Sequence, residues 1–245
     1  MSSPPHHSLI IPAYNEAALL PRLLTTVDAA RSRYRRGAER IEVILADNAS
    51  TDATATIARR AGCKVVPVAK RVIAAARNGG AAAAAGEVLS FVDADTQIHP
   101  ETFNAIDRAL ATGTVVGGAT GVRLERWSLG IALTYLTIVP LVLVTGMDTG
   151  VVFCLRVDFE RLGGYDERRR VAEDVAFLWN LKRLGHQRGQ RLIRLRSAKA
   201  VASTRKFDRY GDWHYFTRII PLGLLALWRP TRRDALAERY WYSDR

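Results

Sequence analysis

Short apolar segments alternate with helix-patterned segments through the first half of the chain, and this order limits the fold more than any other feature. Strand character is concentrated at residues 8–14, 41–48, 63–69 and 87–96. Apolar residues recur at helical spacing in residues 15–34, 50–62, 72–86 and 100–113. Because parallel strands need long crossover connections, the alternation predicts an α/β fold with a mostly parallel central sheet and helices on both faces.

Three local signals refine the predicted helices. Ser50 or Thr51 is placed to cap the second helix, and Pro100 suits the first turn of the fourth. The pair Gly79-Gly80 marks a point where the third helix is expected to be interrupted.

Polar side chains follow three of the predicted strands, in the sequences PAYNE, DNAS and DADT. In an open α/β sheet, ligands bind beyond the carboxyl ends of the strands. Asp47 and Asn48 are therefore candidates for contacting a nucleobase or a ribose. Asp93 and Asp95 could hold a hard divalent cation, with Arg77 as the partner of a diphosphate. Taken alone, Asp47 is equally typical of a helix cap, and the aspartate pair is also typical of a turn.

Composition places the chain among globular proteins. Hydrophobic residues make up 48% of its 245 residues and charged residues 24%, which argues against disorder. Cys63 and Cys154 lie far apart without metal-ligand spacing, and the N-terminus lacks the pattern of a secretory signal. These features predict a cytoplasmic protein in a reducing compartment. His6 and His7 are expected in a mobile terminus and not as metal ligands.

Positive charge is concentrated in the second half of the chain. Residues 1–122 contain 13 Lys/Arg against 11 Asp/Glu, whereas residues 123–245 contain 23 against 13. The net charge of +10 in the second half predicts an anionic partner, such as nucleic acid, anionic lipid or a phosphorylated substrate. A well-solvated basic surface is the alternative.

Five segments occur together in one order: LIIPAYNEAALLPRLL, ILADNASTDAT, ARNGGAAAAAGEVLSFVDADT, LGGYDE and AEDVAFLWNLKRLG. Over roughly residues 8–186 they resemble glycosyltransferase family 2, the inverting GT-A enzymes. The resemblance implies a GT-A-like, Rossmann-type α/β/α sandwich forming one catalytic domain over residues 1–245. Residues 8–122 would be its nucleotide-sugar-binding half, and residues 123–245 its acceptor-binding and membrane-facing half.

The resemblance also implies roles for particular residues. Asp47 looks like the base-binding aspartate, and Asp93 and Asp95 are similar to a DxD motif in which Asp95 ligates Mg²⁺ or Mn²⁺ directly. Asp174, in the sequence AED, looks like the catalytic base, with Glu173 beside it. The residues implied to bind the nucleotide-sugar are Pro12, Ala13, Tyr14, Glu16, Asp47, Asn48, Arg77, Asn78, Asp93 and Ala94.

The residues suit this chemistry on physical grounds as well. Sugar transfer needs the charge of the leaving diphosphate neutralised, which a metal held by Asp95 does as a Lewis acid. It also needs a base that deprotonates the acceptor hydroxyl on the opposite face of the sugar. Glu173 and Asp174 begin an amphipathic helix, where one carboxylate can be oriented for catalysis while the other caps the helix. The alternative is that both are acidic residues of an ordinary helix N-terminus without a catalytic role. A single displacement inverts the anomeric carbon, and the sequence alone leaves retention open.

One departure from the family pattern concerns the acceptor. The QxxRW sequence of processive synthases is missing, and STRKFDRYGDW stands roughly in its place, which favours transfer of a single sugar by a hexosyltransferase-like enzyme (EC 2.4). Arg205, Lys206 and Arg209 are candidates for clamping a diphosphate, and His214 for an acceptor-side loop. A basic surface and an ordinary loop histidine are the alternatives.

Two apolar elements point to a membrane surface. Residues 129–146 contain no charge, and residues 218–233 combine an apolar run with flanking arginines and Trp228. A transmembrane helix at residues 129–146 is disfavoured. Asp95 precedes this segment in sequence and Asp174 follows it, and both must reach one active site on the same side of the membrane. Core packing is the alternative. The two elements therefore predict a peripheral protein at the inner face of a membrane, with a lipid-linked acceptor.

Two rival functions remain at this point. A nucleic-acid-binding protein would place stacking aromatics among the basic residues, but the aromatics lie mostly in apolar runs, so no nucleic acid is expected as a partner. A nucleotidyltransferase would have a Gly-rich basic loop after the first strand, which PAYNEAALLPR is not. For the donor, Asp47 accepts from the imino N–H of uracil or guanine, so UDP- and GDP-sugars both fit.

Overall fold

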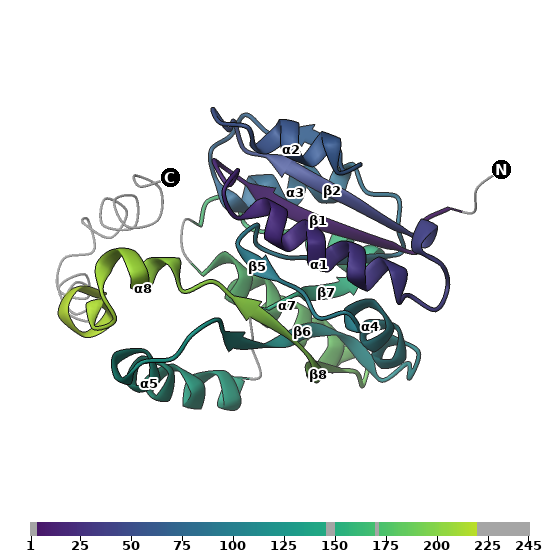
Figure 1. Ribbon diagram of the computed structural model, residues 1–245. Helices are drawn as coiled ribbons and strands as arrows, with labels where there is room; N and C mark the ends of the chain where they lie inside the picture. Colours follow the sequence, from purple (N-terminus) through teal and green to yellow (C-terminus); the bar gives the residue numbers. More distant parts are fainter. Residues whose placement is uncertain (1–3, 146–149, 170–171, 220–245) are drawn as a thin grey trace. The chain divides into compact units, whose positions relative to one another are not determined.

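The computed structural model describes residues 4–145, 150–169 and 172–219. The chain divides into two units (Figure 1). Unit 1 comprises Met1–Arg123 and Met147–Ala202, and unit 2 comprises Leu124–Gly146 and Ser203–Arg245.

An eight-stranded sheet organises unit 1, with the strand order β3-β2-β1-β4-β7-β6-β8-β5. The first four strands in this order run parallel, whereas β7 is antiparallel to both β4 and β6, and β5 is antiparallel to β8. The predicted α/β fold with a mostly parallel central sheet is confirmed. The strands are β1 (His7–Ala13), β2 (Ile41–Asp47), β3 (Lys64–Pro67), β4 (Val88–Phe91), β5 (Thr96–Gln97), β6 (Val115–Leu124), β7 (Val152–Leu155) and β8 (Arg191–Ala202).

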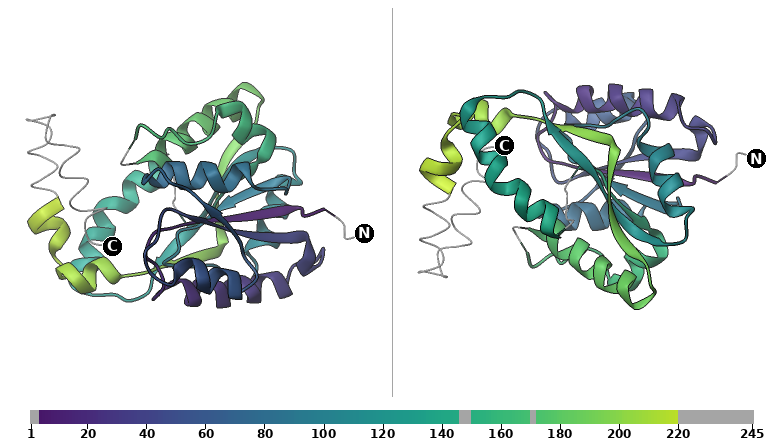
Figure 2. Two further views of the ribbon diagram at one scale, coloured as in Figure 1. Left: turned by 90° about the horizontal axis from the view of Figure 1, so that it is seen from above. Right: turned by 90° about the horizontal axis from the view of Figure 1, so that it is seen from below.

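Helices cover both faces of this sheet (Figure 2). Along β1, Leu9 and Ile11 pack into one apolar cluster with α1, α2 and α4, while Ile10 packs into a second cluster with α3, α6 and α7. This alternation follows from the period of two along a strand, and it explains why β1 is apolar at nearly every position. The helices of unit 1 are α1 (Leu20–Ser32), η1 (Ala38–Arg40), α2 (Thr54–Arg60), α3 (Ile73–Ala82), α4 (Thr102–Leu110), α6 (Arg156–Leu162) and α7 (Glu173–Gln187).

The Gly79-Gly80 pair lies inside an unbroken helix, so the expected interruption of α3 is wrong. A Cβ atom on Gly80 would come within 2.5 Å of Ile10 Cγ2, and one on Gly79 within 2.7 Å of Val68 Cγ2. The two glycines therefore let α3 approach the sheet closely. The expected cap of α2 is also wrong, because this helix begins at Thr54 without a side-chain cap.

The segment predicted as one strand over 87–96 is divided in two. Strand β4 ends at Phe91, and β5 begins at Thr96 and pairs with β8 instead. Between them the Thr96 backbone N–H donates to the Asp93 carbonyl over 3.0 Å. Asp93 and Asp95 therefore lie in a tight turn at the carboxyl edge of the sheet.

A buried polar cluster occupies the start of β1, so the expectation of a mobile terminus at His7 is wrong. The His7 side chain is fully buried, and its Nε2 lies 2.7 Å from Asp107 Oδ1. The other oxygen of Asp107 accepts from Tyr34 over 2.8 Å and pairs with Arg36 at 3.2 Å. In the described part of the chain, His6, His7 and Asp107 are a group that could ligate a metal. Because Tyr34 and the Arg36 cation already contact Asp107, we interpret the group as a structural network.

Unit 2 contains α5 (Leu129–Thr145), α8 (Arg205–Tyr210) and η2 (Tyr215–Ile219). Arg126 joins its two chain segments by pairing with Asp208 at 2.6 Å and with Asp212 at 2.7 Å. Over the ranges that the structure describes, no helix combines the length and the apolar character needed to cross a membrane. Most of the predicted apolar element 218–233 lies outside those ranges.

The buried cluster at His7 predicts a pH-dependent stability. Burial lowers the pKa of His7 below its usual 6.5, so on acidification the unfolded chain takes up a proton before the folded chain does. The free energy of unfolding should therefore fall as the pH drops from about 7 to about 5, which urea titrations at each pH will measure.

The variant His7→Leu isolates this contribution. It should lose about 1–3 kcal/mol at neutral pH, because Asp107 loses a buried hydrogen-bond partner, and its stability should vary less with pH than that of the wild type. His186→Gln, at an exposed position on α7, should keep the wild-type pH dependence. Equal pH dependence in all three proteins would contradict this explanation.

Candidate active site

The loops that follow β1 and β2 are joined at the carboxyl edge of the sheet. The last residues of these strands, Ala13 and Asp47, are paired in register. Beyond them, the Asn15 backbone N–H donates to Ser50 Oγ over 3.1 Å, and the Thr51 backbone N–H donates to Asn15 Oδ1 over 2.8 Å. Ser50 and Thr51 therefore connect two loops instead of capping α2.

Strained backbone occurs in these two loops and directly before α7. Asn15 has φ of 53°, Ala49 has φ of 63° and Ala172 has φ of 56°. In the part of the chain that the structure describes, they are the non-glycine residues with positive φ. Each such conformation costs about 1–3 kcal/mol and is typical of functional sites. All three lie beside residues that the sequence singled out: Tyr14, Asn48 and Glu173.

The predicted nucleotide-binding residues of the first loop differ in exposure. Pro12, Ala13 and Glu16 are buried, and the Glu16 backbone N–H donates to Thr54 Oγ1 over 2.8 Å. Tyr14 is half-buried, with the Arg71 guanidinium carbon 4.1 Å from the centre of its ring. Tyr14 is thus the member of this group whose side chain a ligand can reach.

The side chains after β2 form two different contacts. Asp47 is half-buried, and its Oδ1 accepts from the Ser50 backbone N–H over 3.1 Å, as in a local turn. Asn48 is buried and donates to the carbonyls of Val68 at 3.1 Å and Lys70 at 2.7 Å. Asn48 therefore fixes the loop after β3, while Asp47 lies at the accessible edge.

The turn after β4 presents two carboxylates. Ala94 packs into the core, whereas Asp93 and Asp95 are partly exposed, with 48% of the Asp93 side chain accessible. Carboxylate oxygens are the ligands that Mg²⁺ and Mn²⁺ prefer, so the donor set fits such an ion. Within the described ranges, neither aspartate belongs to a group of three protein ligands. A metal here would complete its shell with oxygens of a bound diphosphate or water.

A buried guanidinium connects this turn to α7. Arg77, on α3, is 7% exposed, and its two terminal nitrogens lie 2.6 Å from Glu173 Oε1 and 3.0 Å from Asp93 Oδ1. Burial opposes its charge, but the carboxylates of Asp93 and Glu173 raise the pKa of Arg77 above its usual value. Burial raises the pKa of Glu173 as well, and Arg77 opposes that rise. Asp174, the next residue, is half-exposed in the first turn of α7.

Asn78 holds the loop that contains the sequence GGYDE. Its Nδ2 donates to the Tyr165 carbonyl over 2.9 Å and to Glu167 Oε1 over 3.0 Å, and its Oδ1 accepts from the Tyr165 N–H over 2.8 Å. Gly164 has φ of 71°, and a Cβ atom on it would come within 2.6 Å of Asn78 Oδ1. Sequence reasoning assigned no role to Tyr165 or Glu167, although the adjacent glycines were a signal of this close approach.

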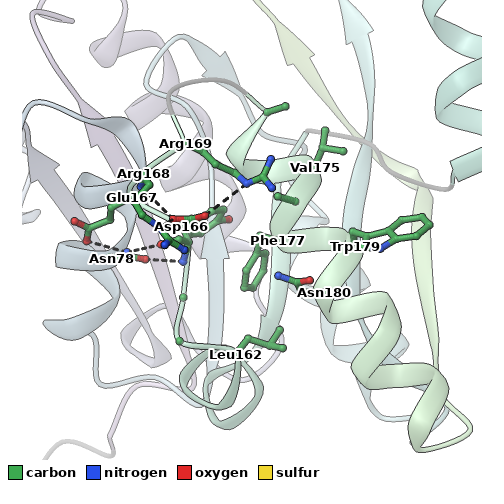
Figure 3. Close-up of a pocket in the computed structure, with 15 residues that line it drawn as sticks. Asn78, Leu162, Asp166, Glu167, Arg168, Arg169, Val175, Phe177, Trp179 and Asn180 are labelled. Atoms are coloured by element: carbon green, nitrogen blue, oxygen red, sulfur yellow. Dashed lines mark hydrogen bonds and ion pairs between the residues drawn. The ribbon is translucent and has the colours of Figure 1, made fainter. Parts of the chain in front are cut away.

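The same loop and the first half of α7 line an open cavity of about 810 Å³. In Figure 3, Asn78 and Glu167 lie on one side of it and Trp179 on the other. Ala172 and Val175, which flank Glu173 and Asp174 in sequence, contribute to its lining. Arg168 and Arg169 line it together with Asp166 and Glu167, and both arginines pair with Asp166, at 3.0 Å and 3.6 Å. The cavity is therefore lined by charged groups of both signs beside the start of α7.

Three predicted acceptor residues belong to unit 2. Arg205 and Lys206 begin α8 and are half-buried. His214 is buried, its Nδ1 lies 2.8 Å from the Gly211 carbonyl, and its ring packs against Phe207. The structure thus brings the other predicted residues together in unit 1, and these three form part of unit 2.

Comparison with known proteins gives partial matches. A validoxylamine A glucosyltransferase from Streptomyces hygroscopicus subsp. jinggangensis is 37% identical over 106 residues, which cover 40% of this chain and 24% of that protein. An undecaprenyl-phosphate 4-deoxy-4-formamido-L-arabinose transferase from Pseudomonas paraeruginosa is 36% identical over 123 residues, covering 45% of this chain and 34% of the relative. The matched region therefore spans 24% and 34% of the lengths of these two relatives.

A solved structure supports the fold. The mannosyltransferase from Pyrobaculum calidifontis, in complex with GDP-Man and Mn²⁺, superposes with a TM-score of 0.64 over 82% of this chain and 57% of that chain. At 24% sequence identity this likeness concerns the fold, which is that of the GT-A glycosyltransferases.

The family model of glycosyl transferase family 2 matches residues 8–180, which include the joined loops, the aspartate turn, the GGYDE loop and the start of α7. The resemblance inferred from the sequence is confirmed, and the chain belongs to glycosyl transferase family 2.

Proposed function

We propose that this protein transfers one sugar from a nucleotide-diphosphate sugar to a lipid-linked acceptor, with inversion at the anomeric carbon. The observation that carries the proposal is the Arg77 bridge, which holds the aspartate turn and the first turn of α7 around one guanidinium. The proposed metal ligands, Asp93 and Asp95, and the proposed base, Asp174, are thereby held near one another. A UDP- or GDP-sugar is the proposed donor, since solved structures of this fold contain UDP-GlcNAc or GDP-Man.

On the donor side, Asp47 and Tyr14 are proposed to contact the nucleoside at the accessible edge of the loops. Asp95, with Asp93, would hold Mg²⁺ or Mn²⁺, which supplies Lewis-acid neutralisation of the leaving diphosphate. Arg77 is buried and already paired with two carboxylates, so we assign it to positioning Asp93 and not to direct phosphate binding. This differs from the role that the family resemblance implied.

On the acceptor side, Asp174 is proposed as the base. Its carboxylate takes the proton of an acceptor hydroxyl while the acceptor oxygen bonds to the anomeric carbon and the bond from that carbon to the diphosphate breaks. Glu173 is unsuited to this task, because it is buried and paired with Arg77. A phosphate acceptor would need no base, since its oxygens are largely ionised at neutral pH.

The lipid-linked acceptor is proposed from two observations. A relative is named as an undecaprenyl-phosphate transferase. The cavity beside α7 also contains Arg168 and Arg169, which pair with Asp166 and are exposed enough to contact a phosphate group as well. The single-sugar outcome follows from the sequence STRKFDRYGDW, which lacks the QxxRW pattern.

Metal-dependent donor binding tests the proposal. A nucleoside diphosphate at about 100 times its Kd should stabilise the protein by about 2.7 kcal/mol, and this gain should require Mn²⁺ or Mg²⁺. In a thermal-shift assay with UDP and GDP, Asp95→Asn should abolish the metal-dependent part, because a neutral amide is a poorer ligand for a hard cation.

Asp28→Asn is the matched control, because it makes the same chemical change at an exposed position on α1. It should bind nucleotide as the wild type does. A full nucleotide-induced shift in EDTA, or in Asp95→Asn, would exclude the metal site at this turn.

Removal of the base tests the acceptor side. Asp174→Asn should reduce turnover on a hydroxyl acceptor by roughly 10²- to 10⁴-fold, because the amide cannot accept the proton. Nucleotide binding in the thermal-shift assay should stay unchanged, since Asp174 acts on the acceptor.

The activity of the same variant distinguishes hydroxyl acceptors from phosphate acceptors. If turnover falls only for hydroxyl acceptors and is nearly retained on a polyprenyl phosphate, the phosphate is the nucleophile and needs no base. Normal turnover on a hydroxyl acceptor would instead assign Asp174 a structural role.

A further inference from the structure

The outer face of α7 carries exposed residues that the core does not need. At 100° per residue, Val175, Trp179, Lys182, Arg183 and His186 fall within one arc of about 100°. The opposite side of the helix carries the buried residues Phe177, Leu178, Leu181 and Leu184. Because packing requires only that opposite side, the outer face is available for another role.

This outer face combines apolar surface with positive charge. Trp179 is 51% exposed and Val175 is 41% exposed, and the Lys182 Nζ lies 5.9 Å from the centre of the Trp179 ring. Lys182 and Arg183 are both exposed. A tryptophan beside lysine and arginine is the combination that suits the boundary between lipid headgroups and water.

A shallow cavity of about 440 Å³ extends this face to the start of β8. It is lined by Trp179, Lys182, Arg183 and His186 from α7, together with Gln190, Arg191 and Leu192 among others. Residues 175–202 contain seven Lys/Arg and no Asp/Glu. One of the seven, Arg188, pairs with Asp158 at 2.6 Å. The excess of positive charge in this segment attracts anions over a distance of about one Debye length, roughly 8 Å at physiological salt.

We propose that this surface, defined by Trp179, Lys182, Arg183, His186 and Arg191, docks unit 1 onto an anionic lipid bilayer. Charge complementarity supports this occupant, since basic residues near a membrane surface are attracted to anionic headgroups while tryptophan inserts at their level. A nucleic acid fits less well, because single-strand binding uses several stacking aromatics and this surface has one.

The surface lies next to the site on the same helix. Trp179 is five residues after Asp174, which is about 8 Å along a helix axis, and it lines both this surface and the cavity beside the GGYDE loop. A bilayer docked here would bring a lipid-linked acceptor close to the proposed base. The delivery of an acceptor to the base rests on the proposed function, whereas binding to the bilayer does not depend on it.

Charge reversal at two exposed residues tests the docking surface in the full-length protein. Vesicles of phosphatidylcholine alone, and of phosphatidylcholine with phosphatidylglycerol, are compared by flotation at low and high salt. The wild type should bind the anionic vesicles and bind them less at high salt. Lys182→Glu with Arg183→Glu should weaken this binding at least tenfold, as the loss of two juxtamembrane cations implies.

Arg59→Glu with Arg60→Glu is the matched control, because it makes the same charge change at exposed positions of α2 in unit 1. It should bind nearly as the wild type, and urea titration should show equal stability for both double variants. If both lose binding equally, or if the α7 variant binds like the wild type, this surface is not the docking site. Binding of an oligonucleotide with no binding to vesicles would assign it to nucleic acid instead.

A nucleotide thermal shift on the same proteins separates this inference from the proposed function. The α7 double variant should keep the metal-dependent shift of the wild type. If the wild type shows no metal-dependent nucleotide shift but still binds anionic vesicles, the proposed function is wrong and the docking surface is still supported.

Discussion

The buried guanidinium of Arg77 carries the contacts on which the candidate site depends. Its partners, Asp93 and Glu173, lie 16 and 96 residues away in sequence, so one side chain of α3 joins the turn after β4 to the start of α7. A buried charge needs a partner of opposite charge. Removing one partner of a buried ion pair lowers the free energy of unfolding by about 3–5 kcal/mol. Asp174 follows Glu173 directly, so its position is tied through Arg77 to that of Asp93.

Glycines allow this polar network to form at the edge of a tightly packed core. Helix α3, which carries Arg77 and Asn78, approaches β1 closely because Gly80 lies against Ile10. At the other end of the network, Gly164 lets the GGYDE loop pass next to Asn78. Any side chain at either position would push α3 or the loop outwards. The geometry of the charged residues is therefore set by van der Waals contacts of residues that have no side chain.

Apolar patterning predicted the order of strands and helices through the first half of the chain and the strand end at Asp47, because these depend on local sequence. Non-local pairing could not be predicted in this way. Strand β7 enters the sheet between β4 and β6, and His7 meets Asp107, 100 residues away. Arg77 is instructive for the same reason. An arginine that binds phosphate and one that pairs with buried carboxylates are identical in sequence, and only the position of Glu173 distinguishes them.

The joined loops have a consequence for the energetics of ligand binding. The loop after β1 shares hydrogen bonds with the loop after β2 through Asn15, and Asn48 connects the latter to the loop after β3. A loop that opens must break bonds that belong to its neighbour, so the three should open as one cooperative unit. Much of their conformational entropy is thus lost during folding. A molecule that binds at this edge meets a preorganised surface, and less of its binding free energy is consumed in ordering the protein.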